Sequence, residues 1–227
     1  MKITWHGHSV IEIITNSGKN ILIDPFIKDN PLTDLKITDC HPDYILLTHA
    51  HHDHVGDTLE IARQSGAKVI AIVELAKYFA QQGVPTAGIN FGGSFKEAGL
   101  AFKLVPAWHT ATLAQTSTGT LSLGNAAGFE LHIEGRVLYD AGDTALFSDM
   151  QLINQGQGVD LAFLPIGDYF TMGIADAQLA ASFVKARRVL PIHYNTFPQI
   201  KQDPQKFIQG LAENVGLNVK IGQTFEL

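Results

Sequence analysis

The stretch from Tyr44 to Asp57 constrains the fold of this chain more than any other part of its sequence. It begins with the apolar run Tyr44–Leu47, which is typical of a short buried strand. Four histidines and one aspartate follow within the six residues from His49 to His54. So many titratable groups are not expected in an apolar core, because burying them without partners is unfavourable. The stretch therefore predicts a strand that ends in a polar site.

The side chains of this stretch are those that bind divalent metal ions. Neutral imidazole and carboxylate suit zinc above all, and they also suit manganese and iron. On a loop after a rigid strand they can turn toward one point, whereas a continuous helix would place His49, His51 and His54 on different faces. The alternative is an exposed histidine-rich turn or an adventitious metal-binding tract. The number of ligands at such short spacing favours the metal site.

Composition and charge narrow the class of protein. A length of 227 residues allows one substantial core, and no linker-like segment divides it, so we expect one domain over residues 1–227. The formal net charge of −6 argues against a protein built to bind nucleic acid. The single cysteine, Cys40, fits a reducing compartment. With no leader-like start and no membrane-length apolar run, we expect a cytoplasmic protein without a membrane partner.

The rest of the chain alternates between strand-like and helix-like segments. Strands are predicted at Lys2–Trp5, Val10–Thr15, Asn20–Asp24, Lys68–Val73, Leu100–Val105, Phe129–Ile133, Arg136–Asp140, Asp160–Leu164, Val189–Ile192, Leu217–Ile221 and Thr224–Leu227. Helices are predicted at Asp57–Arg63, Glu74–Gln82, Ala145–Asn154, Ala175–Arg187 and Asp203–Glu213. The connection from Pro25 to Pro42 is irregular, and such long loops often frame a site.

The order of these segments is similar in the two halves of the chain. Ile21–Asp24 and Val137–Asp140 each follow a hairpin turn and end in aspartate. Asp43–Leu47 and Asp160–Leu164 each lead into a polar loop and a helix. We therefore predict an α/β protein, a four-layer αββα sandwich in which two similar β-rich halves pack face to face and the helices cover the outside.

Further candidate ligands follow other predicted strands. His109, Asp143, His193 and Asp24 each stand at the carboxyl end of a strand, so one edge of the paired sheets could collect them. Taken singly, His109 or His193 is more typical of a structural or surface histidine. Asp143 alone would be typical of a turn residue or of the N-cap of the predicted helix Ala145–Asn154.

Together these residues resemble a known superfamily. The order His-x-His-x-Asp-His, then a distant His, Asp and His, resembles the metallo-β-lactamase superfamily over essentially the whole chain. The segments Trp5–Ser9, Gly167–Gly173 and Pro191–Pro198 resemble the bacterial and archaeal family described only as metal-dependent hydrolases, a relative of the ascorbate-6-phosphate lactonase branch.

The resemblance implies two divalent metal ions, zinc first, with Mn²⁺ or Fe²⁺ as alternatives. The implied ligands are His49, His51 and His109 for the first ion, Asp53, His54 and His193 for the second, and Asp143 as a bridge between both. Two ions roughly 3.5–4 Å apart can share a water and lower its pKa from about 15.7 toward roughly 7, which gives a metal-bound hydroxide.

The remaining polar residues receive weaker assignments. Asp53 could orient the hydroxide as well as bind metal, and Asp24 more naturally supports a ligand histidine from behind. The resemblance places the loop of His6 and His8 beside the metals. His8 is therefore a candidate catalytic residue, acting on substrate, on a proton or on a ligand, and the alternative is an ordinary loop histidine. His52 is expected to point away. The resemblance also suggests Thr171, Met172, Tyr194 and Asn195 as residues lining the pocket.

The function that these features favour is hydrolysis of a small ester, lactone or phosphodiester by a metal-bound hydroxide. The expected partner is a small-molecule substrate, not nucleic acid, and assembly into a homo-oligomer is left open. The alternatives are a non-catalytic metal-binding or sensor protein on the same fold and an RNA-processing nuclease. A di-iron protein that reduces oxygen or NO is less favoured, because its relatives usually carry a glutamate in the first motif where this chain has His51.

Overall fold

The computed structural model describes residues 1–115 and 119–227, and its main strands form two sheets. The first sheet has the strand order β15-β1-β2-β3-β4-β5-β6. Its strands are β1 (Lys2–Trp5), β2 (Ile11–Ile14), β3 (Asn20–Ile23), β4 (Tyr44–Leu46), β5 (Lys68–Ile72), β6 (Thr86–Ile89) and β15 (Thr224–Glu226). The β1-β2-β3 part is antiparallel, and β3 through β6 are parallel.

The second sheet has the order β14-β13-β12-β11-β8-β7. Its strands are β7 (Ser94–Glu97), β8 (Leu100–Pro106), β11 (Ala127–Ile133), β12 (Arg136–Asp140), β13 (Leu161–Pro165) and β14 (Val189–Ile192). The hairpin β11-β12 is antiparallel and β12 through β14 are parallel, as in the first sheet. A separate hairpin joins β9 (Thr112–Gln115) to β10 (Gly119–Ser122). The predicted similarity of the two halves is therefore present in their strand pairing.

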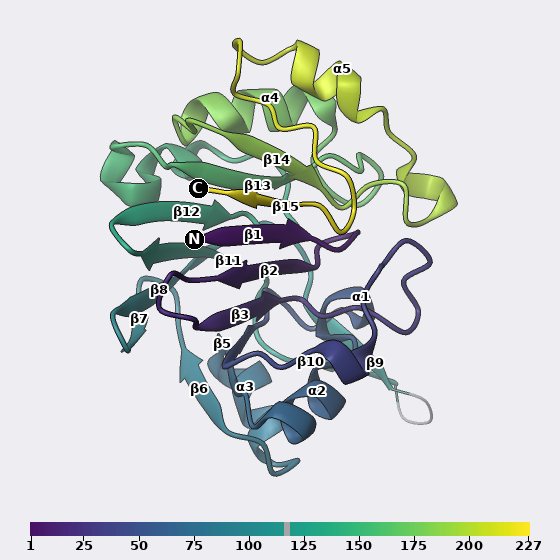
Figure 1. Ribbon diagram of the computed structural model, residues 1–227. Coiled ribbons are helices and arrows are strands. Elements are labelled where there is room, and N and C mark those ends of the chain that lie inside the picture. The colour runs from purple at the N-terminus through teal and green to yellow at the C-terminus, as the bar shows by residue number, and fades with distance from the viewer. Residues whose placement is uncertain (116–118) are drawn as a thin grey trace.

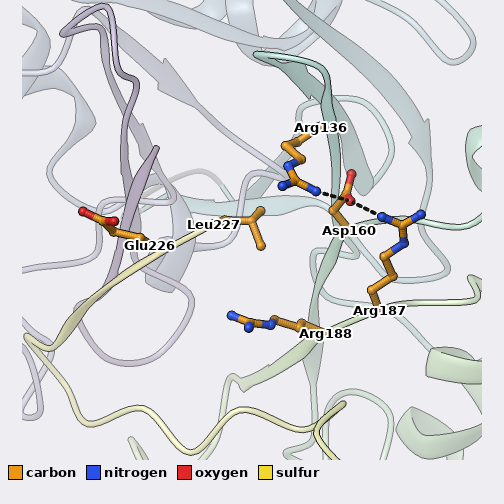
Figure 2. A pocket seen from close by; sticks show the side chains of 6 residues that line it. All are labelled: Arg136, Asp160, Arg187, Arg188, Glu226 and Leu227. Atoms are coloured by element: carbon orange, nitrogen blue, oxygen red, sulfur yellow. Dashed lines mark hydrogen bonds and ion pairs between the residues drawn. The ribbon is translucent and has the colours of Figure 1, made fainter.

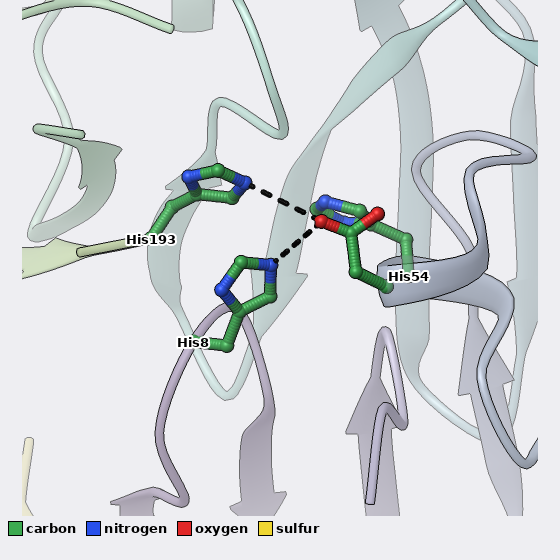
Figure 3. Close-up of side chains that lie close together, drawn as sticks. His8, His54 and His193 are labelled. Atoms are coloured by element: carbon green, nitrogen blue, oxygen red, sulfur yellow. Dashed lines mark hydrogen bonds and ion pairs between the residues drawn. The ribbon is translucent and has the colours of Figure 1, made fainter. Parts of the chain in front are cut away.

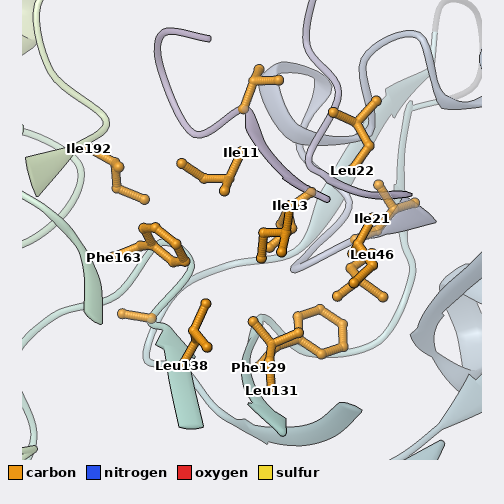
Figure 4. Close-up of a cluster of buried hydrophobic side chains, with 14 of the residues drawn as sticks. Ile11, Ile13, Ile21, Leu22, Leu46, Phe129, Leu131, Leu138, Phe163 and Ile192 are labelled. Carbon is orange, nitrogen blue, oxygen red and sulfur yellow. The ribbon is translucent and has the colours of Figure 1, made fainter. Parts of the chain in front are cut away.

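Apolar side chains of both sheets meet in one core, as Figure 4 shows. Ile11 and Ile13 of the first sheet are fully buried, and so are Phe129 and Phe163 of the second. Burying one such side chain stabilises the fold by roughly 1.5–3 kcal/mol. Because both faces of the parallel strands are covered, these segments read as continuous apolar runs in the sequence.

Helices cover the outer faces of the two sheets and complete the αββα sandwich. In Figure 1, α2 and α3 lie at the bottom beside the first sheet, and α4 and α5 lie at the top beside the second. The α-helices are α1 (His52–Val55), α2 (Thr58–Ser65), α3 (Val73–Ala80), α4 (Ile174–Phe183) and α5 (Pro204–Gln209). The 3₁₀ segments are η1 (Ile37–Asp39), η2 (Ser148–Gly156) and η3 (Pro198–Ile200).

Two predicted elements are wrong. The segment Ala145–Asn154 is not an α-helix: residues 145–147 are irregular, the 3₁₀ segment η2 begins at Ser148, and Asn154 and Gln155 have positive φ angles of 49° and 54°. The backbone N–H of Asn154 donates instead to the buried carboxylate of Glu130. Leu217–Ile221 is not a strand, and the isolated bridge to Val189 is made by Gly216, the residue before this segment.

The end of the chain returns to its beginning. β15 pairs with β1, and the Met1 amino group lies 3.3 Å from the Leu227 carbonyl oxygen, so the two termini are neighbours in Figure 1. The closing strand therefore belongs to the first sheet and not to the second half that precedes it. None of the helices in the described ranges has both the length and the apolar character needed to cross a bilayer.

Candidate metal centre

All seven predicted ligands come together at the carboxyl ends of the central strands. They follow β4, β8, β12 and β14, and they are His49, His51, Asp53, His54, His109, Asp143 and His193. The ligand atoms of His49, His51 and His109 lie within 4.8 Å of one another. Those of Asp53, His54 and His193 also lie within 4.8 Å, in a group that includes His8. The two groups correspond to the two ligand sets that the superfamily resemblance implies.

Asp143 lies between the two groups. Its Oδ2 atom is 3.0 Å from His193 Nε2 and 3.3 Å from His54 Nε2. The same oxygen is 3.6 Å from His109 Nε2 and 4.0 Å from His49 Nε2. One carboxylate thus faces imidazoles of both sets, which is the arrangement of a bridging ligand.

The first ligands are spread by a change of backbone conformation in the middle of the motif. His51 is extended, with φ −63° and ψ 149°, and the short helix α1 begins at the next residue. His49 and His51 therefore precede the helix, whereas Asp53 and His54 lie on its only turn. Gly56 ends α1 at φ 36°, and a Cβ there would lie 2.4 Å from the Pro25 carbonyl oxygen. This close approach requires glycine.

Asp24 fixes the orientation of two ligand histidines. Its Oδ2 accepts hydrogen bonds from His54 Nδ1 at 2.7 Å and from the Thr48 hydroxyl at 2.6 Å. Because the Thr48 hydroxyl donates to Asp24, it accepts from His49 Nδ1, which is 3.0 Å away. Both imidazoles therefore carry their proton on Nδ1 and turn Nε2 toward the site, as metal ligation requires.

His8 lies against the second group and is fully buried. Its Nε2 is 3.1 Å from Asp53 Oδ2, and its Nδ1 is 2.9 Å from the Thr196 hydroxyl. Figure 3 shows the His8 ring beside His193 and His54; the centroids of the His8 and His193 rings are 4.1 Å apart. His8 thus contacts a predicted ligand directly and is not an isolated loop histidine.

Three polar residues of the site adopt positive φ angles, which are unfavourable for residues other than glycine. These are His8 (φ 54°), Asp24 (φ 45°) and His193 (φ 53°). Each such residue costs of order 1–3 kcal/mol and persists only where its surroundings fix it. A hydrogen bond from the His193 N–H to the His8 carbonyl oxygen, 2.9 Å long, ties two of them together. Strain of this kind is concentrated at functional sites.

The pKa values of the site favour ionised carboxylates. Burial alone would raise the pKa of Asp143, but the neighbouring His193 and His54 hold it well below its usual range. The pKa of Asp53 is also lowered, because the hydrogen bond from His8 and the charge of His54 outweigh burial. Both carboxylates are therefore anions at neutral pH and attract a cation.

Most of the imidazoles are held neutral. Burial, together with the neighbouring His193, lowers the pKa of His8 to about 3. Burial and the nearby His54 hold the pKa of His49 well below its usual value. The pKa of His54 is raised, because Asp143 and Asp24 outweigh the effect of burial. A metal ion at His54 Nε2 would replace the proton that Asp143 favours there, whereas the Nδ1 proton bound to Asp24 would stay.

Several buried atoms of the site fit a metal ion. Within the described residues, His54 Nε2, His193 Nε2 and Asp143 Oδ1 have no hydrogen-bond partner. A buried polar atom without a partner costs roughly 1–3 kcal/mol. Lone pairs on imidazole nitrogens and on a carboxylate oxygen are the donors that zinc accepts. The residues therefore fit divalent cations.

The other residues predicted near the site lie outside the two ligand groups. His52 points away, with 65% of its side chain exposed and its Nε2 3.0 Å from Asp29. Tyr194 is buried and stacks on Trp5, and Asn195 accepts a hydrogen bond from Gln202, outside the ligand groups. Thr171 and Met172 are buried in the loop after β13.

Two residues of the site were missed from the sequence. Thr48 links Asp24 to His49, and Thr196 holds His8. Thr48 could have been suspected, because it directly precedes the first ligand of the motif. Thr196 is distant from its partner in the sequence and gives no such signal.

Comparisons with known proteins agree with this geometry. A family model described as "Beta-lactamase superfamily domain" matches residues 19–194, a range that contains all seven predicted ligands. Metal-dependent hydrolases from Ligilactobacillus salivarius and Anoxybacillus flavithermus are 51% and 52% identical, each over the full length of both chains. A solved metallo hydrolase from the archaeon Ignicoccus hospitalis is 36% identical, with a TM-score of 0.89, and the match covers 100% of this chain and 98% of that one. The relation to the ascorbate-6-phosphate lactonase branch stays a prediction.

Proposed function

This chain belongs to the metal-dependent hydrolases of the β-lactamase superfamily, and on that premise we propose that it hydrolyses a small ester, lactone or phosphodiester at a pair of metal ions. The observation that carries the proposal is the Asp143 carboxylate, which faces imidazoles of two separate ligand groups within 4.0 Å. If only one ion bound, one of these two groups of side chains would have no metal to bind.

In this proposal each group of side chains has one ion. His49, His51 and His109 hold the first, Asp53, His54 and His193 hold the second, and Asp143 contacts both. Zinc suits a set dominated by imidazole, with manganese or iron(II) as the alternatives. Once bound, the cations would supply the charge that lowers the pKa of a water and polarises the substrate oxygen.

The residues of the chain supply the proton chemistry. Asp53 is ionised and lies on the exposed side of its group, so it can take a proton from the attacking water and return it to the leaving oxygen. His8 is neutral, and because Asp53 can only accept, His8 donates from Nε2 and accepts the Thr196 hydroxyl at Nδ1. His8 therefore holds the Asp53 carboxylate in one orientation during that transfer.

Metal titration of the stripped protein tests the proposal. We expect chelator-treated protein to bind about two zinc, manganese or iron(II) ions per chain and to recover hydrolysis of an ester, lactone or phosphodiester panel in parallel. His52→Ala, outside the site, serves as the control that keeps both properties. Saturation at one ion would refute the paired site. Full loading without turnover on the whole panel would favour the non-catalytic alternative, a metal-binding or sensor protein.

A further inference from the structure

Three exposed aromatic side chains lie on loops at the edge of the sheets where the candidate ligands gather. They are Trp108, Tyr169 and Phe170, which we call the aromatic rim, and they are 69%, 70% and 49% exposed. The other large apolar residues that are exposed in the described chain are aliphatic and lie elsewhere. Exposed aromatic surface is unfavourable in water, and when gathered at a site it commonly binds a ligand.

Backbone hydrogen bonds connect the aromatic rim to the candidate bridging ligand. Trp108 directly precedes His109, and its N–H donates to the Thr144 hydroxyl at 3.0 Å. Its carbonyl accepts from the Ala145 N–H at 3.2 Å, and the Met172 N–H donates to the Thr144 carbonyl at 2.9 Å. The segments of Trp108 and of Tyr169–Phe170 are therefore both fastened to the residues that follow Asp143.

The loop that presents Tyr169 and Phe170 is tightly turned. The Asp168 N–H donates to the Met172 carbonyl at 3.0 Å, and Asp168 has φ 71°. The Tyr169 and Phe170 rings pack edge to face with centroids 4.7 Å apart. The two rings thus stand outside the core on a short, hydrogen-bonded turn that fixes their position.

Positive charge is scarce around the metal site. The loops at this edge comprise residues 6–10, 24–43, 47–57, 107–111, 141–147, 166–173 and 193–203, and their lysines and arginines are Lys28, Lys36 and Lys201. Lys28 is already paired with Glu60 and Asp57. A phosphate-bearing substrate usually meets arginine or lysine besides the metal.

The arginine cluster of the molecule is at the other end of the strands. Figure 2 shows a cavity of about 230 Å³ that is lined by Arg136, Arg187 and Arg188. Arg136 begins β12 and Arg188 directly precedes β14, whereas Asp143 and His193 follow the opposite ends of these strands. Arg136 and Arg187 both pair with Asp160 there. These charges are therefore too far from the site to neutralise a bound substrate.

The aromatic rim is apolar, and lysine and arginine are scarce on the loops around the metal site. Resting on the proposed hydrolase function, we propose that the substrate is an uncharged carboxylic ester or lactone whose apolar acyl group binds to Trp108, Tyr169 and Phe170. In the reaction the oxygen of water forms a bond to the acyl carbon and the acyl C–O bond breaks. The electron pair of that bond stays on the leaving alcohol oxygen, which takes up one proton of the water. The carboxylic acid loses its own proton to solvent.

A series of p-nitrophenyl esters tests the proposal on the metal-loaded, full-length protein. From acetate through butanoate and hexanoate to octanoate, kcat/KM should rise, by up to roughly three- to fourfold for each methylene that is fully buried. Trp108→Ala should lower kcat/KM for octanoate at least about tenfold more than for acetate, since a large aromatic contact is lost. Leu179→Ala, an exposed apolar residue on α4, is the control that should keep the wild-type preference.

The outcomes separate this inference from the proposed function. Hydrolysis of bis(p-nitrophenyl) phosphate without hydrolysis of any ester would overturn the substrate class and leave the hydrolase proposal standing. Equal rates along the acyl series, in wild type and in Trp108→Ala, would also overturn it.

A binding measurement decides the question even without turnover. The chain has two tryptophans, and Trp5 is buried, so octanamide should change the fluorescence of Trp108 in the wild type and not in Trp108→Ala. No change in the wild type contradicts the proposal. A wild-type dimer that Trp108→Ala converts to monomer, with an unchanged acyl preference, would make the rim an interface between copies and would equally overturn it.

Discussion

Asp143 is the residue on which the two-ion interpretation depends most directly. The N-cap role that its sequence context suggested is excluded, because no α-helix follows and Phe147 precedes the 3₁₀ segment η2. Asp143 is instead buried among four imidazoles, with one carboxylate oxygen unpartnered within the described residues. The charge of the Asp143 side chain, and not its shape, is therefore the property to test.

We predict that Asp143→Asn loses metal affinity and lowers hydrolysis by about 100-fold or more, since even a residue that only supports a ligand contributes roughly 10–100-fold. Asparagine keeps the size of the side chain but removes the anion that would offset the charge of two cations. Metal content, turnover and circular dichroism of the variant provide the measurement. An Asp143→Asn protein with two ions and full activity would show that the carboxylate does not bridge.

Asp24 and Asp140 occupy equivalent places in the two halves, but their contacts differ. Asp24 binds His54 and, through Thr48, His49. Asp140 accepts one hydrogen bond from the Gly142 N–H, and burial together with the charge of Asp24 raises its pKa to about 7. The half of the molecule that supplies the histidine motif thus uses its aspartate to orient ligands, whereas the other uses it to hold the turn before Asp143.

Asp24→Asn should therefore weaken metal binding by roughly 10–100-fold, because Asp24 accepts at both oxygens, from the Thr48 N–H at Oδ1 and from His54 and the Thr48 hydroxyl at Oδ2, whereas an amide has one accepting oxygen. Asp140→Asn should have a smaller effect, since asparagine is close in shape and charge to the protonated acid. Isothermal titration with zinc compares the two variants. Equal losses, or a larger loss for Asp140→Asn, would be inconsistent with the assigned roles.

The gathering of the candidate ligands was predictable from sequence, and their supporting contacts were predictable only in part. The spacing of His49, Asp53 and His54 after an apolar strand can be recognised in the sequence alone, because these residues are close together in the chain. Asp24 was correctly expected behind a ligand histidine, which the bond to His54 confirms. The Thr196–His8 contact depends on where two distant loops meet, and no periodicity encodes it.

At the scale of elements, the loop between β3 and β4 is fastened to the first strands by a buried histidine. His6 is almost fully buried, with Nδ1 2.8 Å from Asp34 Oδ1 and Nε2 3.7 Å from Glu12 Oε2. Burial alone would lower the pKa of His6, but the hydrogen bond to Asp34 and the charges of Glu12 and Asp34 outweigh it and raise the pKa. The contact holds the loop that frames the metal site.

This contact predicts a pH dependence of stability. Because the folded-state pKa of His6 is raised, its contribution is complete below the unfolded pKa of about 6.5 and is lost as pH rises through the folded value. Asp34→Asn should therefore destabilise the protein at about pH 6 and much less at about pH 9. The difference should not exceed about 1 kcal/mol, because Asp34 is partly exposed and solvent screens the pair.

Urea unfolding of wild type and Asp34→Asn across this pH range provides the measurement. Asp39→Asn, an exposed carboxylate in the same loop whose side chain contacts Thr38, is the matched control. A difference between wild type and Asp34→Asn that grows toward high pH would contradict the assigned sign.

The elements that sequence predicted well are those whose burial is regular. β11 and β12 bury most of their apolar residues, and α2 ends at the glycine C-cap Gly66, with φ 74°. β6 and β7 were missed because they are short and largely exposed, so no alternation marks them. The helix predicted at Ala145–Asn154 is replaced by irregular chain and by η2, and at its end the Asn154 N–H bonds to Glu130, a residue 24 positions earlier that local sequence does not bring to mind.

At the scale of the whole molecule, the candidate ligands join the two halves. His49, His51, Asp53 and His54 come from the first sheet and its following turn, whereas His109, Asp143 and His193 follow strands of the second. The apolar core already unites the sheets, so metal is not required for the chain to collapse. It would act as a set of bonds across one edge of that core, where buried donors otherwise lack partners.

We therefore predict that metal raises the stability of the folded protein without changing its secondary structure. A ligand at 100 times its dissociation constant that binds only the folded state stabilises it by about 2.7 kcal/mol. For a chain of this size that corresponds to an increase in Tm of roughly 5–10 °C. Calorimetry of chelator-treated and zinc-loaded protein measures the shift. Asp143→Asn should reduce the increase in Tm and His52→Ala should leave it unchanged, because Asp143 faces candidate ligands from both halves and His52 does not. If the zinc-induced increase in Tm is equally large in Asp143→Asn, the stabilising metal binds elsewhere. The polar side chains at the edge shared by the two sheets would then be a buried cluster that holds no ion.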